Sequence, residues 1–214
     1  MIGILFDLDG TLLDTLEDIR DADNYALRQF GYPEKTLEEV RRVVGNGAAF
    51  QVRGCLPEGT PESVVQEILE VYRPYYTAHC RIKTAPYAGV LEQLKKLQEK
   101  YPVAIVSNKP DSAVKALCAD YFPGMYALGE SDACPRKPAA DMVFAAMKEL
   151  AIDQCIYVGD TEVDVQTAKN AGMPCLCVLW GFRDKEELEA AGGIHFCETT
   201  DQLHDKIEEM IHGK

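Results

Sequence analysis

Two aspartates stand two residues apart in the segment ILFDLDGTLLDT, which begins at Ile4. Asp7 and Asp9 follow an apolar run directly, and carboxylates so close repel each other unless a cation lies between them or a reaction needs both. Their spacing suits phosphoryl transfer, because the first carboxylate can attack phosphorus while the second reaches the leaving oxygen. Gly10 lets the chain turn sharply after the run, and Thr11 extends the polar segment.

Two other interpretations of these aspartates are a solvated turn after a strand and a calcium-binding loop. A calcium loop of the EF-hand type has acids at alternate positions, glycine at the sixth position and helices on both sides. Here glycine is fourth, counted from Asp7, and a predicted strand precedes the acids. The position at the end of a strand favours a catalytic site.

Further polar residues follow two other apolar runs. They are Ser107, Asn108 and Lys109 after VAIV, and Asp160 and Asp164 after CIYVG. Because ligands of open parallel sheets bind outside the carboxyl ends of the strands, we expect these residues to converge with the first two aspartates. Four acids in one place favour a hard divalent cation, and a few carboxylates with water and substrate phosphate are typical of Mg²⁺.

Lys137, in the tripeptide RKP, supplies a positive charge that a phosphate would need. Together with Ser107 it could bind the non-bridging phosphate oxygens, and Asn108 is included in the same predicted phosphate site. Simpler interpretations remain for each residue. Ser107 could be a cap, Lys137 a surface lysine and Asn108 a turn residue, while Asp160 and Asp164 could be a helix N-cap and an exposed acid.

Alternating strands and helices must position these residues. Apolar runs predict strands at residues 2–6, 103–107, 125–128, 155–158, 175–179 and 194–196. Helical spacing predicts helices at residues 15–30, 36–44, 61–76, 90–100, 111–122, 139–150, 163–171, 186–191 and 200–211. The alternation predicts an α/β fold with a doubly wound, Rossmann-like parallel sheet.

The first strand is followed by a stretch that reads as helical throughout. We therefore predict a core domain of residues 1–14 and 84–214, with an inserted all-helical cap domain of residues 15–83. In the cap, RRVVGNG places Arg42, Asn46 and Gly47 at a helix end and the turn after it. These residues either close over the substrate and contact its leaving group or only terminate the helix. Residues 180–183 (WGFR) are expected at the rim of the site.

The composition limits the partners. The net charge of −13, from 35 acids against 22 bases, argues against non-specific nucleic-acid binding. No apolar run approaches the roughly 20 residues that span a bilayer, and none resembles a signal peptide. Eight cysteines without paired metal-site spacing are typical of reduced thiols, so we expect a cytoplasmic protein.

In order along the chain, DLDGTLLDT, VSNKP, RKP and GDTEVD resemble the four motifs of the haloacid dehalogenase superfamily. The resemblance covers essentially the whole chain and implies the small helical cap of that family. Within it, SNKP, GDTEVDVQTAKNAG and VVGNG are most similar to phosphoglycolate phosphatases, although a second proline usual soon after the lysine-proline pair is absent here.

This resemblance implies residue roles. Asp7 would be the nucleophile that forms an aspartyl-phosphate, and Asp9 the general acid and then the base. Asp7, the backbone carbonyl of Asp9, and Asp160 would bind Mg²⁺. Lys137 and Ser107 would hold the phosphoryl group. Asp164 would orient Lys137 or a metal-bound water, with Thr11 in support.

The expected function is a Mg²⁺-dependent phosphatase, a phosphoric monoester hydrolase, whose partner is a small phosphorylated metabolite. Phosphoglycolate is the leading candidate, and a monomer or homodimer is expected. Alternatives of the same fold are a phosphosugar mutase, a pyrophosphatase and a nucleotidase. A binding protein that only senses a phosphorylated metabolite would be expected to have lost Asp7 or Asp9, and both are present.

Overall fold

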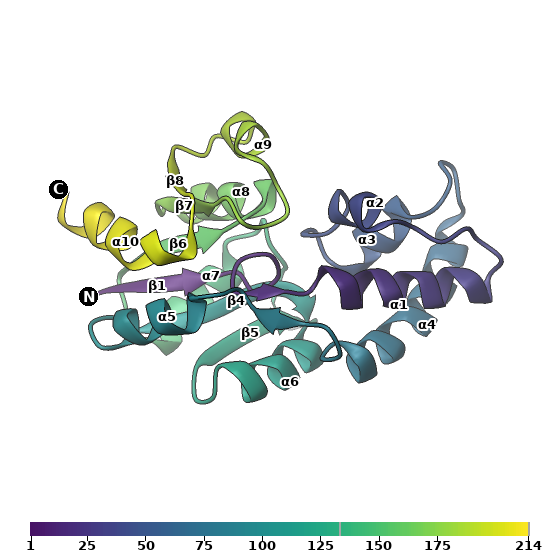
Figure 1. Ribbon diagram of the computed structural model, residues 1–214, viewed down its shortest axis with the longest axis horizontal. Helices are drawn as coiled ribbons and strands as arrows, with labels where there is room; N and C mark the ends of the chain where they lie inside the picture. Colours follow the sequence, from purple (N-terminus) through teal and green to yellow (C-terminus); the bar gives the residue numbers. More distant parts are fainter. Residues whose placement is uncertain (133, 214) are drawn as a thin grey trace.

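A six-stranded parallel sheet forms the centre of the protein (Figure 1). The computed structural model describes residues 1–132 and 134–213. The strands lie in the order β5-β4-β1-β6-β7-β8. They are β1 (Ile2–Phe6), β4 (Val103–Pro110), β5 (Tyr126–Glu130), β6 (Gln154–Gly159), β7 (Cys175–Val178) and β8 (His195–Cys197). The predicted doubly wound α/β fold is confirmed, and all six predicted strands are present.

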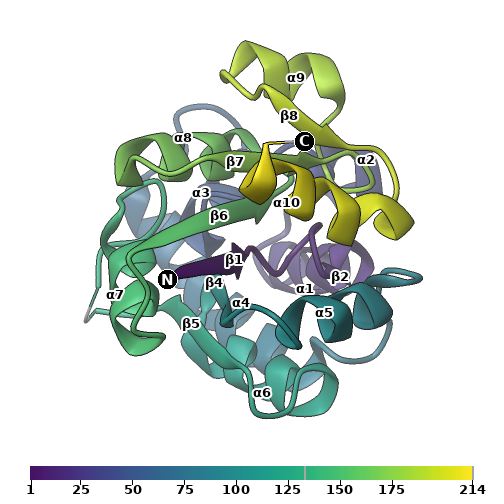
Figure 2. The ribbon, with the colours of Figure 1, turned by 90° about the vertical axis from the view of Figure 1, so that its left-hand side faces the viewer.

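Helices cover both faces of this sheet, as Figure 2 shows. One face carries α5 (Val90–Gln98), α6 (Asp111–Tyr121) and α10 (Leu203–His212), and the other carries α7 (Asp141–Glu149) and α8 (Glu162–Ala171). Successive side chains of β1 point to opposite faces, so Ile4 and Phe6 join one apolar core while Leu5 joins the other. The short helices α9 (Lys185–Ala190) and η1 (Thr200–Gln202) flank β8.

Four helices lie beyond the carboxyl end of β1, between β2 (Leu13–Asp14) and β3 (Ala85–Pro86) (Figure 1). They are α1 (Leu16–Gln29), α2 (Leu37–Arg41), α3 (Ala48–Gly54) and α4 (Glu62–His79). We call residues 15–83 the helical segment. Its apolar stripes face inward, and Ile19, Val52 and Ile68 are buried between the helices.

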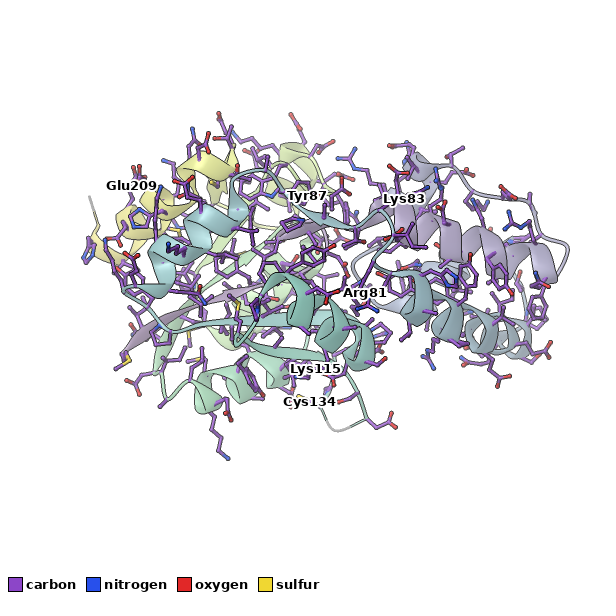
Figure 3. The ribbon with its side chains drawn as sticks, turned by 60° about the horizontal axis from the view of Figure 1, so that its bottom comes forward. Arg81, Lys83, Tyr87, Lys115, Cys134 and Glu209 are labelled. Atoms are coloured by element: carbon purple, nitrogen blue, oxygen red, sulfur yellow. The ribbon has the colours of Figure 1, made fainter. Side chains whose placement is uncertain are left out.

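The chain crosses between the sheet and the helical segment twice, and the two crossings lie side by side. β2 and β3 pair in antiparallel fashion, with Asp14 opposite Ala85. The buried carboxylate of Asp18 accepts hydrogen bonds from the backbone N–H groups of residues 82, 83 and 84. Figure 3 shows Lys83 and Arg81 at this junction. The predicted boundaries of the core and the cap fall here, and the division into two domains stays a prediction.

Local differences from the sequence predictions have simple causes. β2 and β3 were not predicted, because two-residue strands carry no apolar pattern. Helix α3 was not predicted either, because AAFQVRG has no clear helical period. The predicted start of α2 at Thr36 is confirmed as a capping box, in which Glu39 N–H donates to Thr36 Oγ1 at 3.2 Å. Across the described part of the chain, no helix is long and apolar enough to cross a membrane.

Candidate active site

Three adjacent strands bring the predicted site residues together. β1 lies between β4 and β6, and all three run in the same direction. Asp7 follows β1, Ser107 lies in the second half of β4, and Asp160 follows β6. The exposed fractions of these three residues are 4%, 1% and 0%. The carboxyl edge of the sheet therefore carries a closely packed group of buried polar side chains, as the topology requires.

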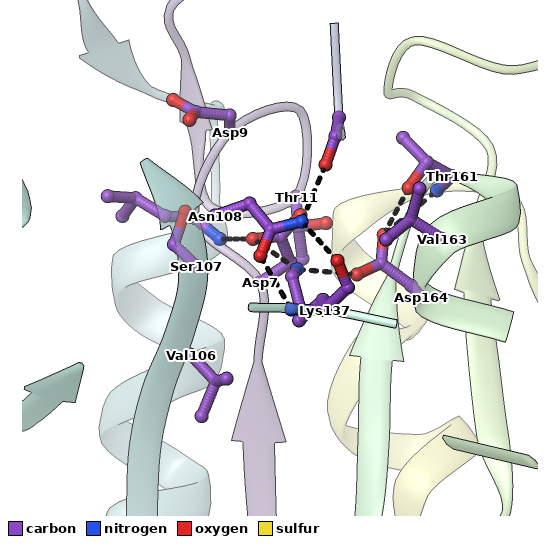
Figure 4. Close-up of polar contacts among 12 residues, drawn as sticks. Asp7, Asp9, Thr11, Val106, Ser107, Asn108, Lys137, Thr161, Val163 and Asp164 are labelled. Atoms are coloured by element: carbon purple, nitrogen blue, oxygen red, sulfur yellow. Dashed lines mark hydrogen bonds and ion pairs between the residues drawn. The ribbon is translucent and has the colours of Figure 1, made fainter. Parts of the chain in front are cut away.

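Lys137 lies between two of the carboxylates (Figure 4). Its Nζ is 2.9 Å from Oδ1 of Asp7 and 2.7 Å from Oδ1 of Asp164, and the side chain is 1% exposed. Burial alone would lower the pKa of Lys137, but the charges of Asp164 and Asp7 outweigh it and hold the pKa well above its usual value. The ammonium is therefore a permanent positive charge beside Asp7.

Asn108 fixes the backbone at Lys137. Its Oδ1 accepts the Lys137 N–H at 2.8 Å, and its Nδ2 donates to the Lys137 carbonyl at 2.9 Å and to the Gly45 carbonyl at 3.2 Å. Both polar atoms of the side chain thus have partners within the protein. A direct phosphate contact from Asn108 stays a prediction, and the contacts present here position Lys137 and the Gly45 loop.

Asp160 is held by neutral hydrogen-bond donors. Its Oδ1 accepts the Thr11 hydroxyl at 2.8 Å, and its Oδ2 accepts the Phe182 N–H at 2.8 Å. Gly10 and Gly181 pack directly on this carboxylate, and a Cβ at either position would collide with it. Within residues 1–132 and 134–213, no basic side chain forms an ion pair with Asp160. Its negative charge therefore lacks a cationic partner in the protein.

Asp7, Asp160 and Asp164 form a compact acidic group whose oxygen atoms lie within 4.8 Å of one another. Burial, followed by the charge of Asp164, raises the pKa of Asp7 to about 7, although Lys137 opposes the rise. Burial and the charges of Asp164 and Asp7 raise the pKa of Asp160 well above its usual value. The protein therefore disfavours ionisation of both carboxylates together, which is the situation that a bound cation relieves.

Asp164 has a different environment, because its oxygens are already occupied. Oδ1 accepts the Lys137 ammonium, and Oδ2 accepts the Thr161 N–H at 3.0 Å, the Thr161 hydroxyl at 2.8 Å and the Asp160 N–H at 3.2 Å. These contacts cap the start of α8. The alternative of an exposed acid is therefore wrong for Asp164, which is 0% exposed, and the N-cap of α8 is Thr161 rather than Asp160. The buried Asp164 completes the capping box and also holds Lys137.

Asp9 lies apart from this acidic group and points away from Lys137 (Figure 4). Its Oδ1 accepts the Thr15 hydroxyl at 2.6 Å and lies 2.8 Å from Nζ of Lys109. Lys109 is 6% exposed, and its ammonium also contacts the Tyr76 hydroxyl. The second aspartate of the motif is thus paired with a lysine that sequence reasoning left without a role.

A cavity of about 30 Å³ lies between the sheet edge and the helical segment. Its floor contains Asp7, Asp9 and residues 107–110 of β4, which include Ser107. The side chains facing them come from α1, α3 and α4 and the turn before α3: Ile19, Val44, Ala48, Gln51, Tyr72 and Tyr76. By this measure the cavity has room for about two water molecules.

The three predicted substrate contacts in the helical segment lie in different places. Gly47 lines the cavity, and its φ of 82° together with the nearby Arg136 side chain favours glycine there. Asn46 is partly buried and does not line the cavity. The Arg42 side chain is 73% exposed and pairs with Glu38 at 3.0 Å. Their roles in binding stay predictions.

Arg183 is a buried residue that connects the sheet to the helical segment, and the sequence did not predict this role. It pairs with Glu162 at 2.7 Å and donates to the carbonyls of Arg41 at 2.8 Å and Val44 at 2.9 Å. The expected location of residues 180–183 near the site thus agrees with the contacts of Phe182 and Arg183. The sequence signal for Arg183 was only its position after a strand end.

The comparisons with known proteins agree with the geometry. A family profile described as haloacid dehalogenase-like hydrolase matches residues 4–178. A phosphoglycolate phosphatase of Rhodobacter capsulatus is 34% identical, and the match covers 88% of each chain. A Lactobacillus delbrueckii structure provisionally assigned as a phosphoglycolate phosphatase is 37% identical with a TM-score of 0.91, covering 96% of this chain and 97% of that one. A predicted phosphatase from Clostridium acetobutylicum is 28% identical, with a TM-score of 0.87 and coverage of 96% and 97%.

Proposed function

Because the chain belongs to the haloacid dehalogenase-like hydrolases and is a phosphoric monoester hydrolase, we propose that it cleaves a small phosphomonoester through an aspartyl-phosphate on Asp7. Phosphoglycolate is the leading candidate substrate, since relatives at about 34% identity carry that name. The observation that carries the proposal is the buried Asp7 carboxylate, with Lys137 2.9 Å away and Asp160 beside it.

The free oxygen of Asp7 suits it as the nucleophile. The Leu8 N–H at 2.7 Å and the Lys137 ammonium both contact Oδ1. Among the described residues no donor contacts Oδ2, which keeps its lone pairs for attack on phosphorus. In the first step the bond from Oδ2 to phosphorus forms and the bond from phosphorus to the leaving oxygen breaks. In the second step water attacks phosphorus, which releases inorganic phosphate and the Asp7 carboxylate.

Asp9 is proposed to move the proton in both steps. Protonated, it donates to the leaving oxygen, which departs as an alcohol, and the resulting carboxylate then takes a proton from the attacking water. In the conformation described here its Oδ1 is bound to Thr15 and Lys109 and the side chain points away from Lys137, so the side chain must turn to reach the leaving oxygen. Movement of the helical segment as a cap would supply that change and would also exclude and admit water.

Lys137 and Ser107 are proposed to hold the transferred phosphoryl group. An ammonium has three donors, and two of those on Lys137 point to Asp7 and Asp164, which leaves one for a phosphoryl oxygen. The Ser107 hydroxyl is buried at the cavity floor and accepts the Lys109 N–H at 3.2 Å. Its own proton is therefore available for a second phosphoryl oxygen.

The site also fits a divalent cation. Asp7 and Asp160 lie in the acidic group, and Asp160 has no cationic partner among the described residues. We propose that these two carboxylates, with the Asp9 backbone carbonyl, hold Mg²⁺. When bound, the metal would neutralise charge on the phosphoryl oxygens. Asp164 would not be a ligand, because four donors already occupy its oxygens.

Free thiols support a cytoplasmic location. All eight cysteines are unpaired, six of them are buried, and none forms a disulfide. This arrangement suits a reducing compartment.

The test is phosphate release from phosphoglycolate, a hexose phosphate, a nucleoside monophosphate and pyrophosphate, with Mg²⁺ and with EDTA. We expect metal-dependent phosphate release that is fastest from phosphoglycolate. Asp7→Asn should lower the rate by on the order of 10⁴-fold or more. Asp14→Asn, at an exposed acid of the same motif, is the matched control. Full activity of Asp7→Asn, conversion of the hexose phosphate to an isomer, or absence of turnover would each contradict the proposal.

A further inference from the structure

The outer wall of the active-site cavity offers few groups that could recognise a leaving group. Ile19, Val44 and Ala48 contribute apolar surface. The polar groups are the hydroxyls of Tyr72 and Tyr76, whose rings stack at 5.5 Å, and the amide of Gln51. In this conformation only about 30 Å³ separates the wall from the floor, so a short leaving group requires a smaller displacement of the helical segment than a sugar ring or a nucleoside. The wall therefore favours a substrate whose part beyond phosphorus is short.

Lys109 provides the positive charge of this cavity. Among the described residues that line it, Lys109 alone is cationic, since Lys137 lies beneath Asp7 and is not part of the lining. The Lys109 ammonium lies 4.4 Å from the centre of the Tyr76 ring and contacts the hydroxyl of that tyrosine. Its other contact is Oδ1 of Asp9 at 2.8 Å. One of its three donors remains free for a ligand.

The Gln51 amide is held in one orientation by groups behind it. Its Nε2 donates to both oxygens of Asp23, at 2.9 and 3.0 Å, and to the Tyr72 hydroxyl at 3.1 Å. Within the described residues, no hydrogen bond reaches its carbonyl oxygen. An acceptor oxygen would repel a second anionic group on that side of the cavity. The recognition of negative charge is thus confined to the side where Lys109 and Tyr76 lie.

We propose that Lys109, assisted by the Tyr76 hydroxyl, is the specificity-determining residue and binds a carboxylate on the leaving alcohol. The substrate class would then be phosphorylated hydroxy acids of two or three carbons. This inference rests on the proposed phosphatase activity. A carboxylate matches the geometry because it brings one compact negative charge into a small cavity whose cation is buried.

The same contact couples substrate binding to Asp9. A substrate carboxylate that binds the third donor of the Lys109 ammonium shares its positive charge with Oδ1 of Asp9 and weakens that ion pair. With this ion pair weakened, Asp9 is held mainly by its hydrogen bond with Thr15 and is freer to turn toward the leaving oxygen. A substrate with a carboxylate should therefore be favoured in kcat as well as in KM, which a binding contact without this coupling would not produce.

The experiment compares phosphoglycolate with ethyl phosphate, which has the same two carbons but a methyl group in place of the carboxylate. For the wild type we expect kcat/KM to be higher for phosphoglycolate by on the order of 10²-fold or more. Lys109→Met, which retains an unbranched side chain one atom shorter and removes the charge, should remove most of this preference. Tyr76→Phe should reduce it in part. Lys148→Met, at an exposed lysine on α7, is the matched control and should keep it.

The outcomes separate this inference from the proposed function. If the wild type hydrolyses both esters equally well, the phosphatase activity stands and the role of Lys109 is refuted; this comparison needs no variant. If Lys109→Met lowers kcat/KM for both esters by the same factor, Lys109 acts only through Asp9, and the inference is again wrong. If the wild type hydrolyses neither ester nor any other phosphomonoester, the proposed function itself fails.

Discussion

The carboxyl group of Asp23 is buried inside the helical segment, and among the described residues no basic side chain pairs with it. It lies on α1 and is 2% exposed. Gln51 donates to both of its oxygens, and the Cys55 thiol lies 3.9 Å from one of them. Burial raises the pKa of Asp23 to about 7, and these hydrogen bonds offset only part of the rise. Burial also raises the pKa of the neighbouring Cys55 and Tyr72, which therefore stay neutral.

The protein should consequently lose stability as Asp23 ionises. The ordinary pKa of the group is 3.8, so the folded protein retains a proton between about pH 4 and pH 7 that the unfolded chain has lost. The contribution of protonated Asp23 to the free energy of unfolding is fully present below about pH 4. It is lost progressively as the pH rises from there through 7. At about 1.36 kcal/mol for each pKa unit, the whole loss is about 4 kcal/mol.

The test is urea unfolding of the wild type and Asp23→Asn at several pH values from 5 to 8. The difference between the two free energies of unfolding at each pH cancels the contributions of the other titrating groups. Between pH 5 and pH 8 we expect the free energy of unfolding of the wild type to fall by about 3 kcal/mol relative to that of the variant. Glu17→Gln, at an exposed acid on the same helix, is the control and should give a nearly constant difference. A constant difference for Asp23→Asn as well would mean that Asp23 is ionised in the folded protein, which would refute the reasoning.

Two further predictions concern the contacts around the site. Arg183→Lys replaces a planar fork, which reaches the carbonyls of Arg41 and Val44, by a single point charge. We expect faster amide exchange in residues 41–47 and a rise in KM of about 10-fold, and unchanged exchange would contradict this expectation. Asp160→Asn should weaken Mg²⁺ activation by on the order of 10²-fold, measured by metal titration of activity and by calorimetry. An unaltered titration would exclude Asp160 as a ligand.

The fold could be predicted well where a pattern is local. The strands of the central sheet are continuous apolar runs, and burial on both faces produces that pattern directly. The pairing of β2 with β3 depends on contacts between residues some 70 positions apart, such as Leu13 and Pro86, and two residues carry no period. Helix α3 is stabilised by packing against α4 rather than by its own sequence, which explains why it could not be predicted.

The candidate site divides in the same way. Asp7, Ser107 and Asp160 could be predicted to converge because each stands toward the carboxyl end of a strand. The three strands are neighbours in the sheet, which brings these side chains into one site. Lys109 and Gln51 could not, because their importance depends on which helices face the sheet edge. The one available signal was that Lys109 directly follows Ser107 and Asn108 at a strand end.

The partners of the four acids indicate where a metal would bind. Lys109 pairs with Asp9, and Lys137 lies between Asp7 and Asp164. Two ammonium groups against four carboxylates leave two formal negative charges, which one divalent cation would balance. Because Asp164 already accepts four donors and Asp9 points away, the unbalanced charge lies on Asp7 and Asp160. The sequence pattern suggested repulsion between the neighbouring Asp7 and Asp9. In the structure the uncompensated repulsion instead lies between Asp7 and Asp160, which are 153 positions apart and follow the adjacent strands β1 and β6.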